Sequence, residues 1–499
     1  MSYKYAKPSL LQAFIPIIFL IIALSINVFL FEDWSLDGSN QIILVLSAGV
    51  AALVALQLGY KWEEVRKGIV KSISSAMASI IILLLIGCLA GTWLISGIVP
   101  AMIYYGLDIL NPTIFLFAAC IVCSIVSIAT GSSWTTAATV GIALIGIGKA
   151  LGLHEGMIAG AVLSGAYFGD KMSPLSDTTN LAPAMAGTDL FTHIRYMAYT
   201  TIPSISIALI LFLILGFVNG GSGEVQETAA IQEAISSKFN INGWLFLVPV
   251  AVVVLIVKKM PAIPAILIGA LLGAVFALIF QPEIVQGIGS GLFKEIYDGR
   301  DFSSTSAMLA FMGTMKSLYG DVAIVTGNAV VDDLLTSGGM YGMLKTVWLI
   351  LAAMMFGGVM EACGMLKRIA EAVITKVHSH GSLVAATTGT TVFFNVTASD
   401  QYLAIVVPGR MYADIYKDKG LAPENLSRTL EDSGTVTSVL VPWNTCGAYH
   451  SNVLGVATVA YLPFAFFNYI SPLMTIIFAY LKIKIRMRNE SGSEKEVAI

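Results

Sequence analysis

The feature that most constrains this chain is a series of apolar segments of about 20 residues that recurs along almost its whole length. A helix needs roughly 20 mainly apolar residues to cross the hydrocarbon core of a bilayer. Only 12% of the residues are charged, compared with about 25% in soluble domains. The sequence therefore predicts an all-α polytopic membrane protein. Candidate crossings lie at 11–31, 41–58, 75–98, 111–129, 155–169, 197–218, 243–257, 262–281, 343–363, 382–396, 423–450 and 456–481.

The segment 305–325 is ambiguous, because Lys316 and Asp321 interrupt its apolar residues. With this segment left open, we expect about 11–13 transmembrane helices. The chain has no visible signal peptide, since its first residues lead directly into a full-length span that is expected to remain. The net charge of −3 gives no indication of a nucleic-acid partner. The expected surroundings are the lipid bilayer.

A polar linker at 219–242 divides the chain near its middle. We expect a first transmembrane half at 1–218, a second transmembrane half at 243–485 and a polar tail at 486–499. No long soluble domain is expected in either half, because the other polar stretches are shorter than this linker.

The second half of the chain repeats features of the first half at a nearly constant offset. CLAGTWLISGIVPAMI (88–103) aligns with MFGGVMEACGMLKRI (355–369), and Thr130 aligns with Thr397 at the same offset. Internal repeats of this kind are typical of secondary transporters, whose binding sites lie on interrupted helices at the repeat interface. The two repeat cores are expected at about 70–218 and 340–481.

Short polar breaks interrupt the apolar segments at matching positions in the two halves. TGSSWTT (130–136) and TASDQY (397–402) are each followed by too few apolar residues for an ordinary crossing, which predicts two re-entrant hairpins. PLSDTTN (174–180) and PWNTCG (442–447) each contain a proline, which removes a backbone donor and breaks a helix. Broken backbone within a membrane is tolerated only where it is buried in protein or lines a cavity. We therefore expect two inverted repeats, each with a re-entrant hairpin and a discontinuous helix.

Basic residues near the apolar segments indicate the orientation of the chain. Short cytoplasmic loops are enriched in Lys and Arg, so the loop with the basic residues of 61–71 is expected in the cytoplasm, together with the N-terminus. The same rule places the basic loop 366–381 inside, while its repeat partner 99–110 should lie outside, which favours inversion. The basic C-terminal sequence KIKIRMR (482–488), three crossings later, would then lie outside, against the same rule.

Acidic and hydroxyl residues gather at the breaks. Asp170 and Asp177 flank Pro174, and Asp400 lies at the tip of the second hairpin. A carboxylate at the centre of a span costs roughly 2.5–3.5 kcal/mol on insertion scales, so an intramembrane acid indicates a function. Hard cations such as Na⁺ prefer oxygen ligands, which include the carbonyls of a broken helix. The candidate ion-binding residues are Asp177, Asp170, Ser176, Thr178, Thr179, Asn180, Ser132, Ser133, Asn395, Thr397, Asp400, Asn444 and Thr445.

A carboxylate that accepts either a proton or Na⁺, but never both, is the minimal physical basis of antiport. Asp177 is the first choice, since it lies at a break between Ser176 and Thr178. Asp170 is the second choice for the ion-binding carboxylate. An ion pair between Asp170 and its neighbour Lys171, without any bound ion, explains this residue equally well. Further candidates for proton relay or substrate contact are Lys171, Glu431, Asp432, His450, Arg410 and Glu361.

Enzyme signatures are missing from the sequence, which contains no H-E-x-x-H and no G-x-S-x-G. The segment 141–150 fails as a phosphate loop, because Ala143 replaces the first glycine and Ala150 replaces the Ser or Thr. We therefore expect no enzyme and no cofactor, and a transport process powered by ion gradients.

The segment SGAYFGDKMSPLSDTTNLAPAMAGTDLFTHIRYM (164–197) resembles the signature region of the NhaC-type Na⁺/H⁺ antiporter family, within the ion transporter superfamily. TSGGM (336–340), FGGVMEACG (356–364) and NVTASDQYLAIVVPGRMY (395–412) are also similar to that family, so the resemblance covers roughly 10–480. It implies a bacterial inner-membrane antiporter that exchanges cytoplasmic Na⁺ for protons. The Ser-Asn-Thr triplets of the superfamily are absent here, and the first hairpin has Gly-Ser-Ser instead.

One branch of this family exchanges malate and protons for lactate and Na⁺, so a Na⁺-coupled carboxylate exchanger is the alternative function that the resemblance implies. Small organic acids would need positive charge in the site, and Lys171 and Arg410 are the cations near the breaks. A homodimer is expected by analogy. Either function requires that Asp177 and the break at 397–402 converge in the folded protein.

Overall fold

The structure is a computed structural model of the chain. It describes residues 5–31, 38–109, 111–219, 225–258, 260–298, 303–374, 377, 379–488 and 495–496.

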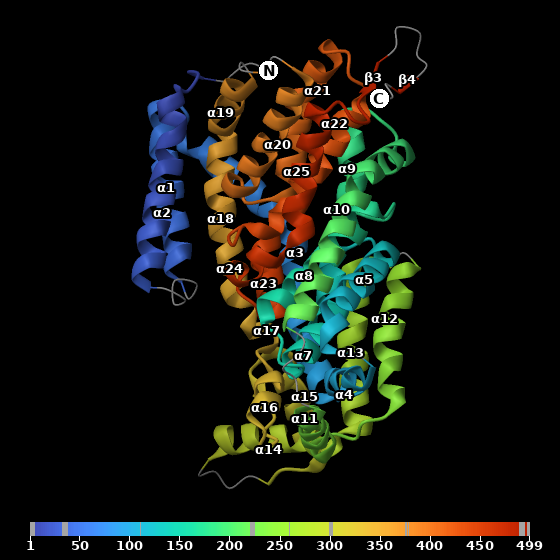
Figure 1. The fold of residues 1–499 in the computed structure, drawn as a ribbon. Helices are drawn as coiled ribbons and strands as arrows, with labels where there is room; N and C mark the ends of the chain where they lie inside the picture. The colour runs from blue at the N-terminus through green and yellow to red at the C-terminus, as the bar shows by residue number, and fades with distance from the viewer. Residues whose placement is uncertain are drawn as a thin grey trace.

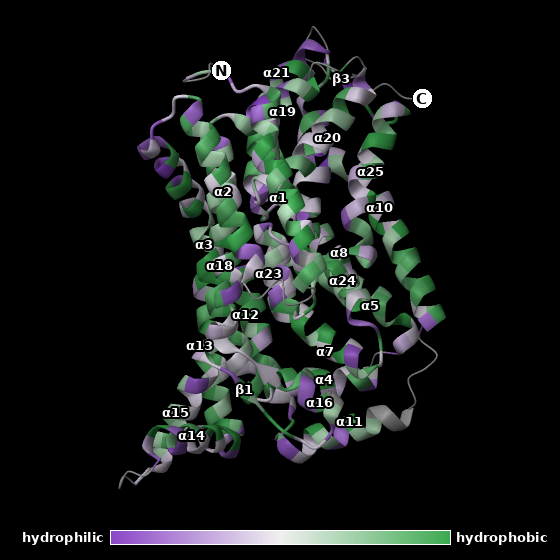
Figure 2. Ribbon diagram, turned by 90° about the vertical axis from the view of Figure 1, so that its left-hand side faces the viewer, coloured by the Kyte–Doolittle hydropathy of each residue, from purple (hydrophilic) through white to green (hydrophobic). Residues whose placement is uncertain are grey.

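The described chain is almost entirely helical (Figure 1). Within the described residues, seven helices are long and apolar enough to cross a membrane, or up to nine if each of two bent helix pairs counts as one span. This confirms the prediction of an all-α polytopic membrane protein. In Figure 2 the long helices are mainly hydrophobic, whereas hydrophilic residues gather around α19 at one end of the molecule and around α16 at the other.

The elements of the first half are α1 (Leu10–Phe31), α2 (Ser39–Gln57), α3 (Trp62–Ile95), α4 (Ile98–Ile109), α5 (Pro112–Thr130), α6 (Ser133–Thr136), the π-helix η2 (Ala137–Gly141), α7 (Ile142–Ala150), α8 (Glu155–Met172), α9 (Asp177–Ala186), α10 (Leu190–Asn219) and α11 (Val225–Lys238). The helix α11 lies within the predicted polar linker.

The elements of the second half are η3 (Gly243–Phe246), α12 (Leu247–Val257), α13 (Ala262–Phe280), α14 (Pro282–Tyr297), α15 (Ser306–Tyr319), β1 (Val322–Ala323), α16 (Ala329–Leu334), β2 (Thr336–Ser337), α17 (Gly339–Gly342), α18 (Leu344–Ala362), α19 (Met365–Ile374), α20 (His380–Thr397), α21 (Gln401–Asp418), α22 (Pro423–Leu430), the π-helix η4 (Glu431–Thr435), η5 (Ser438–Leu440), α23 (Thr445–Leu454), α24 (Thr458–Tyr461), η6 (Leu462–Phe464), α25 (Phe466–Tyr480), β3 (Arg486–Met487) and β4 (Lys495–Glu496). The strands form two antiparallel pairs, β1 with β2 and β3 with β4.

Fewer helices satisfy length and composition than the 11–13 predicted crossings, because several of the predicted crossings are broken or polar. The segment 423–450 is divided among α22, η4, η5 and α23. The helix α8 carries Glu155, Asp170 and Lys171 in its 18 residues. The ambiguous segment 305–325 forms α15, whose 14 residues end before β1. The number of crossings therefore depends on how the broken helices are counted.

Small residues allow the central helices to pack closely, which is how helices associate where no water is available to drive them together. The helix α3 packs along α13 and α18, and α5 packs along α8. A Cβ atom on Gly165 of α8 would lie 2.1 Å from the carbonyl oxygen of Cys120 of α5, so only glycine fits there. The α5–α8 pair brings the ends of both helices, where the sequence breaks, into one region.

The N-terminus and the C-terminus lie at the same end of the molecule (Figure 1). Tyr5 donates a hydrogen bond to Glu64 of α3, and Arg368 of α19 donates to the carbonyl oxygen of Pro8. Arg486 of the C-terminal basic segment forms an ion pair of 3.2 Å with Glu424 of α22. The three basic segments at the starts of α3 and α19 and after α25 therefore share one end.

The sequence left the side of KIKIRMR open, because counting crossings and the basic residues gave opposite indications, and the structure places this segment at the same end as the N-terminal residues (Figure 1). The reason is that α20 and α21 form a hairpin that returns to the end where it began. His380 at the start of α20 lies 3.3 Å from the carbonyl oxygen of Lys419, just beyond the end of α21. The hairpin therefore starts and ends at the same end of the molecule, and α25 brings the chain back to that end (Figure 1).

Candidate functional site

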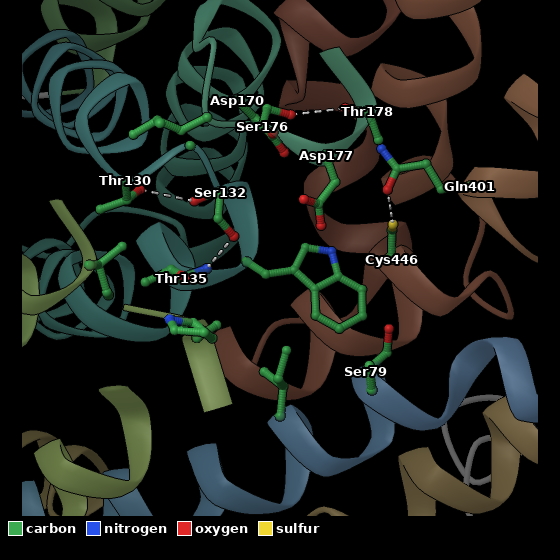
Figure 3. Close-up of a pocket in the computed structure, with 18 of the residues that line it drawn as sticks. Ser79, Thr130, Ser132, Thr135, Asp170, Ser176, Asp177, Thr178, Gln401 and Cys446 are labelled. Carbon is green, nitrogen blue, oxygen red and sulfur yellow. Dashed lines mark hydrogen bonds between the residues drawn. The ribbon is translucent and has the colours of Figure 1, made fainter. Parts of the chain in front are cut away.

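A pocket with a volume of about 440 Å³ lies where the helix breaks of the two halves meet (Figure 3). The break between α5 and α6, the break between α8 and α9, and the first turns of α21 and α23 surround it, and α3 and the α12–α13 turn contribute further side chains. The polar residues that line it are Ser79, Thr130, Ser132, Thr135, Asp170, Ser176, Asp177, Thr178, Gln401, Tyr402, Thr445 and Cys446.

The break between α5 and α6 is formed by two residues with complementary roles. Gly131 ends α5 in the left-handed conformation, with a φ of 70° that glycine adopts without a steric penalty. Ser132 then caps α6, because its hydroxyl accepts a hydrogen bond from the backbone amide of Thr135 at 3.2 Å. A Cβ atom on Gly131 would lie 2.6 Å from the Cβ atom of Leu175, so this break touches the break that follows α8.

The break between α8 and α9 is stabilised by its own side chains. Ser176 caps α9 and its hydroxyl lies 3.1 Å from that of Thr178 (Figure 3). The hydroxyl of Thr179 donates to the carbonyl oxygens of Asp170 and Lys171 at 3.1 and 3.0 Å. The side chain of Asn180 donates to the carbonyl oxygens of Pro174 and Ser176. Thr179 and Asn180, two predicted ion ligands, therefore satisfy the backbone of the break and do not line the pocket.

Asp170 is buried at the end of α8 and faces the first break. One of its carboxylate oxygens accepts two hydrogen bonds from Ser133, from the hydroxyl at 2.6 Å and from the backbone amide at 3.1 Å. These bonds join α8 to the N-terminus of α6. Asp170 also lines the pocket, so its carboxylate is both held in place and available to a ligand.

Lys171 does not form an ion pair with Asp170, although such a pair was the alternative to ion binding by Asp170. Its ammonium group is fully buried, forms an ion pair with Asp432 of η4 and donates to Ser471 of α25 at 2.9 Å. The other oxygen of Asp432 accepts a hydrogen bond of 2.7 Å from Thr200 of α10. Lys171 and Asp432 therefore join the two halves away from the pocket.

Asp177 begins α9 and its side chain is exposed within the pocket. Tyr402, in the first turn of α21, donates a hydrogen bond of 3.3 Å to its carboxylate. Asp177 and the break at 397–402 therefore converge, as the paired arrangement requires. Next to them, the thiol of Cys446 lies 3.0 Å from the side-chain oxygen of Gln401 (Figure 3).

Glu431 lies directly behind the pocket. It is buried in the π-helix η4, and one of its carboxylate oxygens accepts a hydrogen bond of 3.0 Å from Thr178, which lines the pocket. Its other oxygen has no hydrogen-bond partner among the described residues. Single π-helical turns often occur at functional sites. The hydroxyl group of Thr178 thus stands between the carboxylate of Glu431 and the pocket.

Three further candidates of the second half are occupied in contacts behind the pocket, and Asn395 and Asn444 contact each other. Asn444, the N-cap of α23, donates to the backbone and side-chain oxygens of Asn395 at 3.0 and 3.2 Å. Asn395 donates in turn to the carbonyl oxygen of Gly434 at 2.7 Å. Asp400 caps α21 by accepting from the amide of Leu403 at 2.9 Å. These side chains are buried and do not line the pocket.

Four further candidates lie outside the pocket, and one lines it. The hydroxyl of Thr397 bonds back to the carbonyl oxygen of Phe393. The ring of buried His450 makes a hydrogen bond of 2.8 Å with the carbonyl oxygen of Cys446. Arg410 is exposed on α21, and Glu361 is half-buried near the end of α18. Thr445 lines the pocket beside Cys446.

Sequence analysis did not single out several residues that line the pocket. Among them are Thr135, Trp134, Gln401, Tyr402 and Cys446. All five lie within the quoted breaks, and a rule that takes every polar or aromatic side chain in the turn after a break would have found them. Hard cations prefer oxygen ligands, so an ion site by itself does not predict the indole ring of Trp134 or the thiol of Cys446.

Comparisons with known proteins point to one family of transporters. Residues 165–483 match the model of the Na⁺/H⁺ antiporter family. The chain is 38% identical over 458 residues to the Na⁺/H⁺ antiporter NhaC of Alkalihalophilus pseudofirmus, which covers 92% of each chain. It is 37% identical over 475 residues to the malate-2H⁺/Na⁺-lactate antiporter of Bacillus subtilis, which covers 95% of each chain. The solved structure of Neisseria gonorrhoeae MtrF aligns over 95% of this chain and 96% of that chain at 14% identity, with a TM-score of 0.37.

Proposed function

Because the chain belongs to the Na⁺/H⁺ antiporter family, we propose that it is a secondary active transporter that exports Na⁺ in exchange for protons at the pocket between its helix breaks. The family assignment and the apolar helices establish an integral multi-pass membrane protein. The bacterial inner membrane is the location that the proposal assigns to it.

The observation that carries the site is the position of Asp170. Its carboxylate is held by Ser133 and faces a pocket whose other side-chain oxygens come from hydroxyl groups, from Gln401 and from Asp177. Such a set suits a hard cation, which prefers oxygen ligands. A carboxylate removed from water can take either a proton or the ion. The proposed ligands, all of them pocket residues, are Asp170, Asp177, Ser132, Ser176, Thr178 and Thr445.

The proposed architecture is a pair of inverted repeats with one re-entrant hairpin each. The hairpin of α20 and α21 opens toward the end that holds the termini, whereas α5 and α7 lie toward the opposite end (Figure 1). The helices α5 and α7 are the two arms of the hairpin in the first half. These arms contact each other, because a Cβ atom on Gly148 of α7 would lie 2.8 Å from the ring of Phe115 of α5. Opposite orientation of the two hairpins is what inversion predicts.

The proposed cytoplasmic end is the end that holds the two termini. Basic residues near the starts of α3 and α19 and after α25 gather there, and short cytoplasmic segments are enriched in Lys and Arg. The homodimer, the absence of a cofactor and the division into two halves at the linker stay predictions.

Carboxylate exchange is the less favoured function, although a malate/lactate antiporter is among the relatives. No Lys or Arg is among the described residues that line the pocket. Lys171 is held by Asp432, and Arg410 is exposed elsewhere on α21. The two cations that could have bound an organic acid are therefore not in the pocket.

Purified protein in proteoliposomes tests this function. Na⁺ is added outside vesicles that contain no organic acid, and the internal pH is followed with a fluorescent dye. We expect Na⁺ entry to drive protons out of the vesicles, so that the interior becomes alkaline. Empty vesicles give no such change. A requirement for malate or lactate would instead establish the carboxylate exchanger, and Na⁺ movement that cannot be driven by a pH gradient would exclude antiport.

A further inference from the structure

We propose that the ion pocket also binds small organic cations that carry an ammonium group. This inference rests on the proposed function, because it names a second class of ligand for the same site. Three properties of the pocket carry it, namely its size, its charge and its aromatic rings.

The pocket is larger than a bare ion requires. Oxygen ligands coordinate a hard cation at about 2.0–2.6 Å, so such an ion occupies only a small part of the volume of about 440 Å³. Pockets for small organic molecules have volumes of about 300–1,000 Å³. The space beside the carboxylates is therefore sufficient for a ligand with several carbon atoms.

The charge of the pocket selects for cations. Asp170 and Asp177 line it, and none of the described lining residues is Lys, Arg or His. Lys258, in the α12–α13 turn, lies two residues after the lining residue Ile256, but its side chain is exposed and does not line the pocket. A concave site with charges of one sign concentrates ligands of the opposite sign, so organic anions are disfavoured and organic cations favoured.

Aromatic rings provide a second recognition element that Na⁺ alone does not need. The indole ring of Trp134 lines the pocket and stacks on Tyr449, with ring centroids 3.8 Å apart and planes at 21°. The hydroxyl of Tyr449 donates to the carbonyl oxygen of Trp134, which fixes the two residues together. Tyr402 adds a second ring beside Asp177. Rings near carboxylates bind ammonium groups through cation–π attraction.

Choline is a suitable probe, because its quaternary ammonium group stays charged at every pH and cannot cross the vesicle as a free base. Na⁺-driven proton movement is measured in proteoliposomes at increasing choline concentrations. We expect choline to raise the Na⁺ concentration for half-maximal exchange without lowering the maximal rate, as a competitor for the same site does. Lactate and malate, tested at the same concentrations, should not compete.

The aromatic contribution is tested with Trp134→Leu and Trp134→Phe. In Trp134→Leu, loss of the ring should raise the inhibitory concentration of choline by about tenfold. This change is corrected for any shift in the half-maximal Na⁺ concentration of the same variant. The Phe variant, which keeps a ring, should stay within about threefold of the original protein. Trp244→Leu is the matched control, because Trp244 is exposed and lies outside the pocket.

Failure of this inference can be told apart from failure of the proposed function. If Na⁺ drives proton movement but choline does not compete, the pocket binds only inorganic cations and the inference is wrong. Competition by lactate in place of choline also overturns it. If Na⁺ drives no proton movement at all, the proposed function fails, and choline binding is then measured directly by calorimetry on the purified protein.

Discussion

Ser133 donates two hydrogen bonds to the same carboxylate oxygen of Asp170, from its hydroxyl at 2.6 Å and from its backbone amide at 3.1 Å. The amide belongs to the first turn of α6, where the orphan donors of a helix point outward. A helix N-terminus also carries partial positive charge, which stabilises an anion. The first break thus orients the acid of the second break, and neither break alone makes the site.

Replacement of Asp170 tests the central ligand. Asp170→Asn keeps the shape of the side chain, and the amide oxygen can still accept from Ser133. We expect the protein to insert and fold but to lose Na⁺-driven proton movement, because the amide can neither bind a proton nor provide charge to Na⁺. The measurement is the pH change in proteoliposomes, together with the amount of monodisperse purified protein.

The matched control for this variant is Asp189→Asn. Asp189 lies in the loop before α10, is outside the pocket and accepts a hydrogen bond from the amide of Thr192 at 3.0 Å. Hydrogen bonds from Thr192 lower the pKa of Asp189, so this carboxyl stays ionised at neutral pH. Exchange should be normal in the control. Normal exchange in Asp170→Asn itself would remove Asp170 from the site.

Lys171→Met should destabilise the protein, because it leaves the carboxylate of Asp432 buried without its cation. Removal of one partner of a buried ion pair costs roughly 3–5 kcal/mol. We expect the melting temperature of the purified protein to fall clearly. The double variant Lys171→Met with Asp432→Asn should recover most of this loss, since neither position of the pair then carries a charge.

Lys67→Met is the comparison for the ion pair, because Lys67 and Glu63 are paired at 3.2 Å on an exposed face of α3. Exposed pairs contribute about 0–1 kcal/mol, so the melting temperature should hardly change. An equal effect of Lys67→Met and Lys171→Met, or no recovery in the double variant, would contradict the assigned pairing.

Gly131→Ala tests the contact between the two breaks of the first half. The new Cβ atom would lie 2.6 Å from the Cβ atom of Leu175, in addition to the strain of a φ of 70°. The strain alone costs roughly 1–2 kcal/mol. We expect a lower melting temperature and a marked loss of Na⁺-driven proton movement.

Gly152→Ala separates strain from contact, because Gly152 has a φ of 74° and its added Cβ atom would meet nothing within 4 Å. In this variant the melting temperature should fall because of the backbone strain alone. Na⁺-driven proton movement should stay nearly normal. If Gly131→Ala and Gly152→Ala behave alike, the contact between the breaks does not contribute to the site.

Single introduced cysteines test the shared location of the termini. The five native cysteines are all buried, so a membrane-impermeant maleimide should label introduced residues selectively. Glu63→Cys near the start of α3 and Arg488→Cys after β3 should be labelled from the same side of the membrane. Glu283→Cys, exposed on α14 at the other end, should be labelled from the opposite side. Labelling of Glu63→Cys and Arg488→Cys from different sides would contradict the fold.

The positions of the helix breaks were predictable from the sequence alone. The described chain breaks between Thr130 and Ser133, between Met172 and Asp177, between Thr397 and Gln401, and between Leu440 and Thr445. Each break coincides with a quoted polar or proline-containing motif. The physical reason is local, because a proline or a polar cluster within an apolar helix disrupts the backbone hydrogen bonds wherever that helix packs.

The sidedness of the C-terminus could not be predicted by counting crossings. The apolar segment 382–396 has the length and composition of a crossing, yet α20 and α21 return to the end where α20 begins. The path of the chain after α20 depends on the packing at the tip of the hairpin, where the amide of Thr445 at the start of α23 donates to the carbonyl oxygen of Ser399.

Taken alone, the sequence determined that the chain is a helical membrane protein with paired breaks, and it indicated the acids on which an ion could bind. Only the tertiary structure decided which acid is buried and which cation is paired. Sequence proximity suggested Lys171 as the partner of Asp170, but the ammonium group of Lys171 meets Asp432, 261 residues away. Hydrophobicity and helix breaking act within a few residues and can be recognised in a linear sequence, whereas the pairing of buried charges depends on which helices pack together.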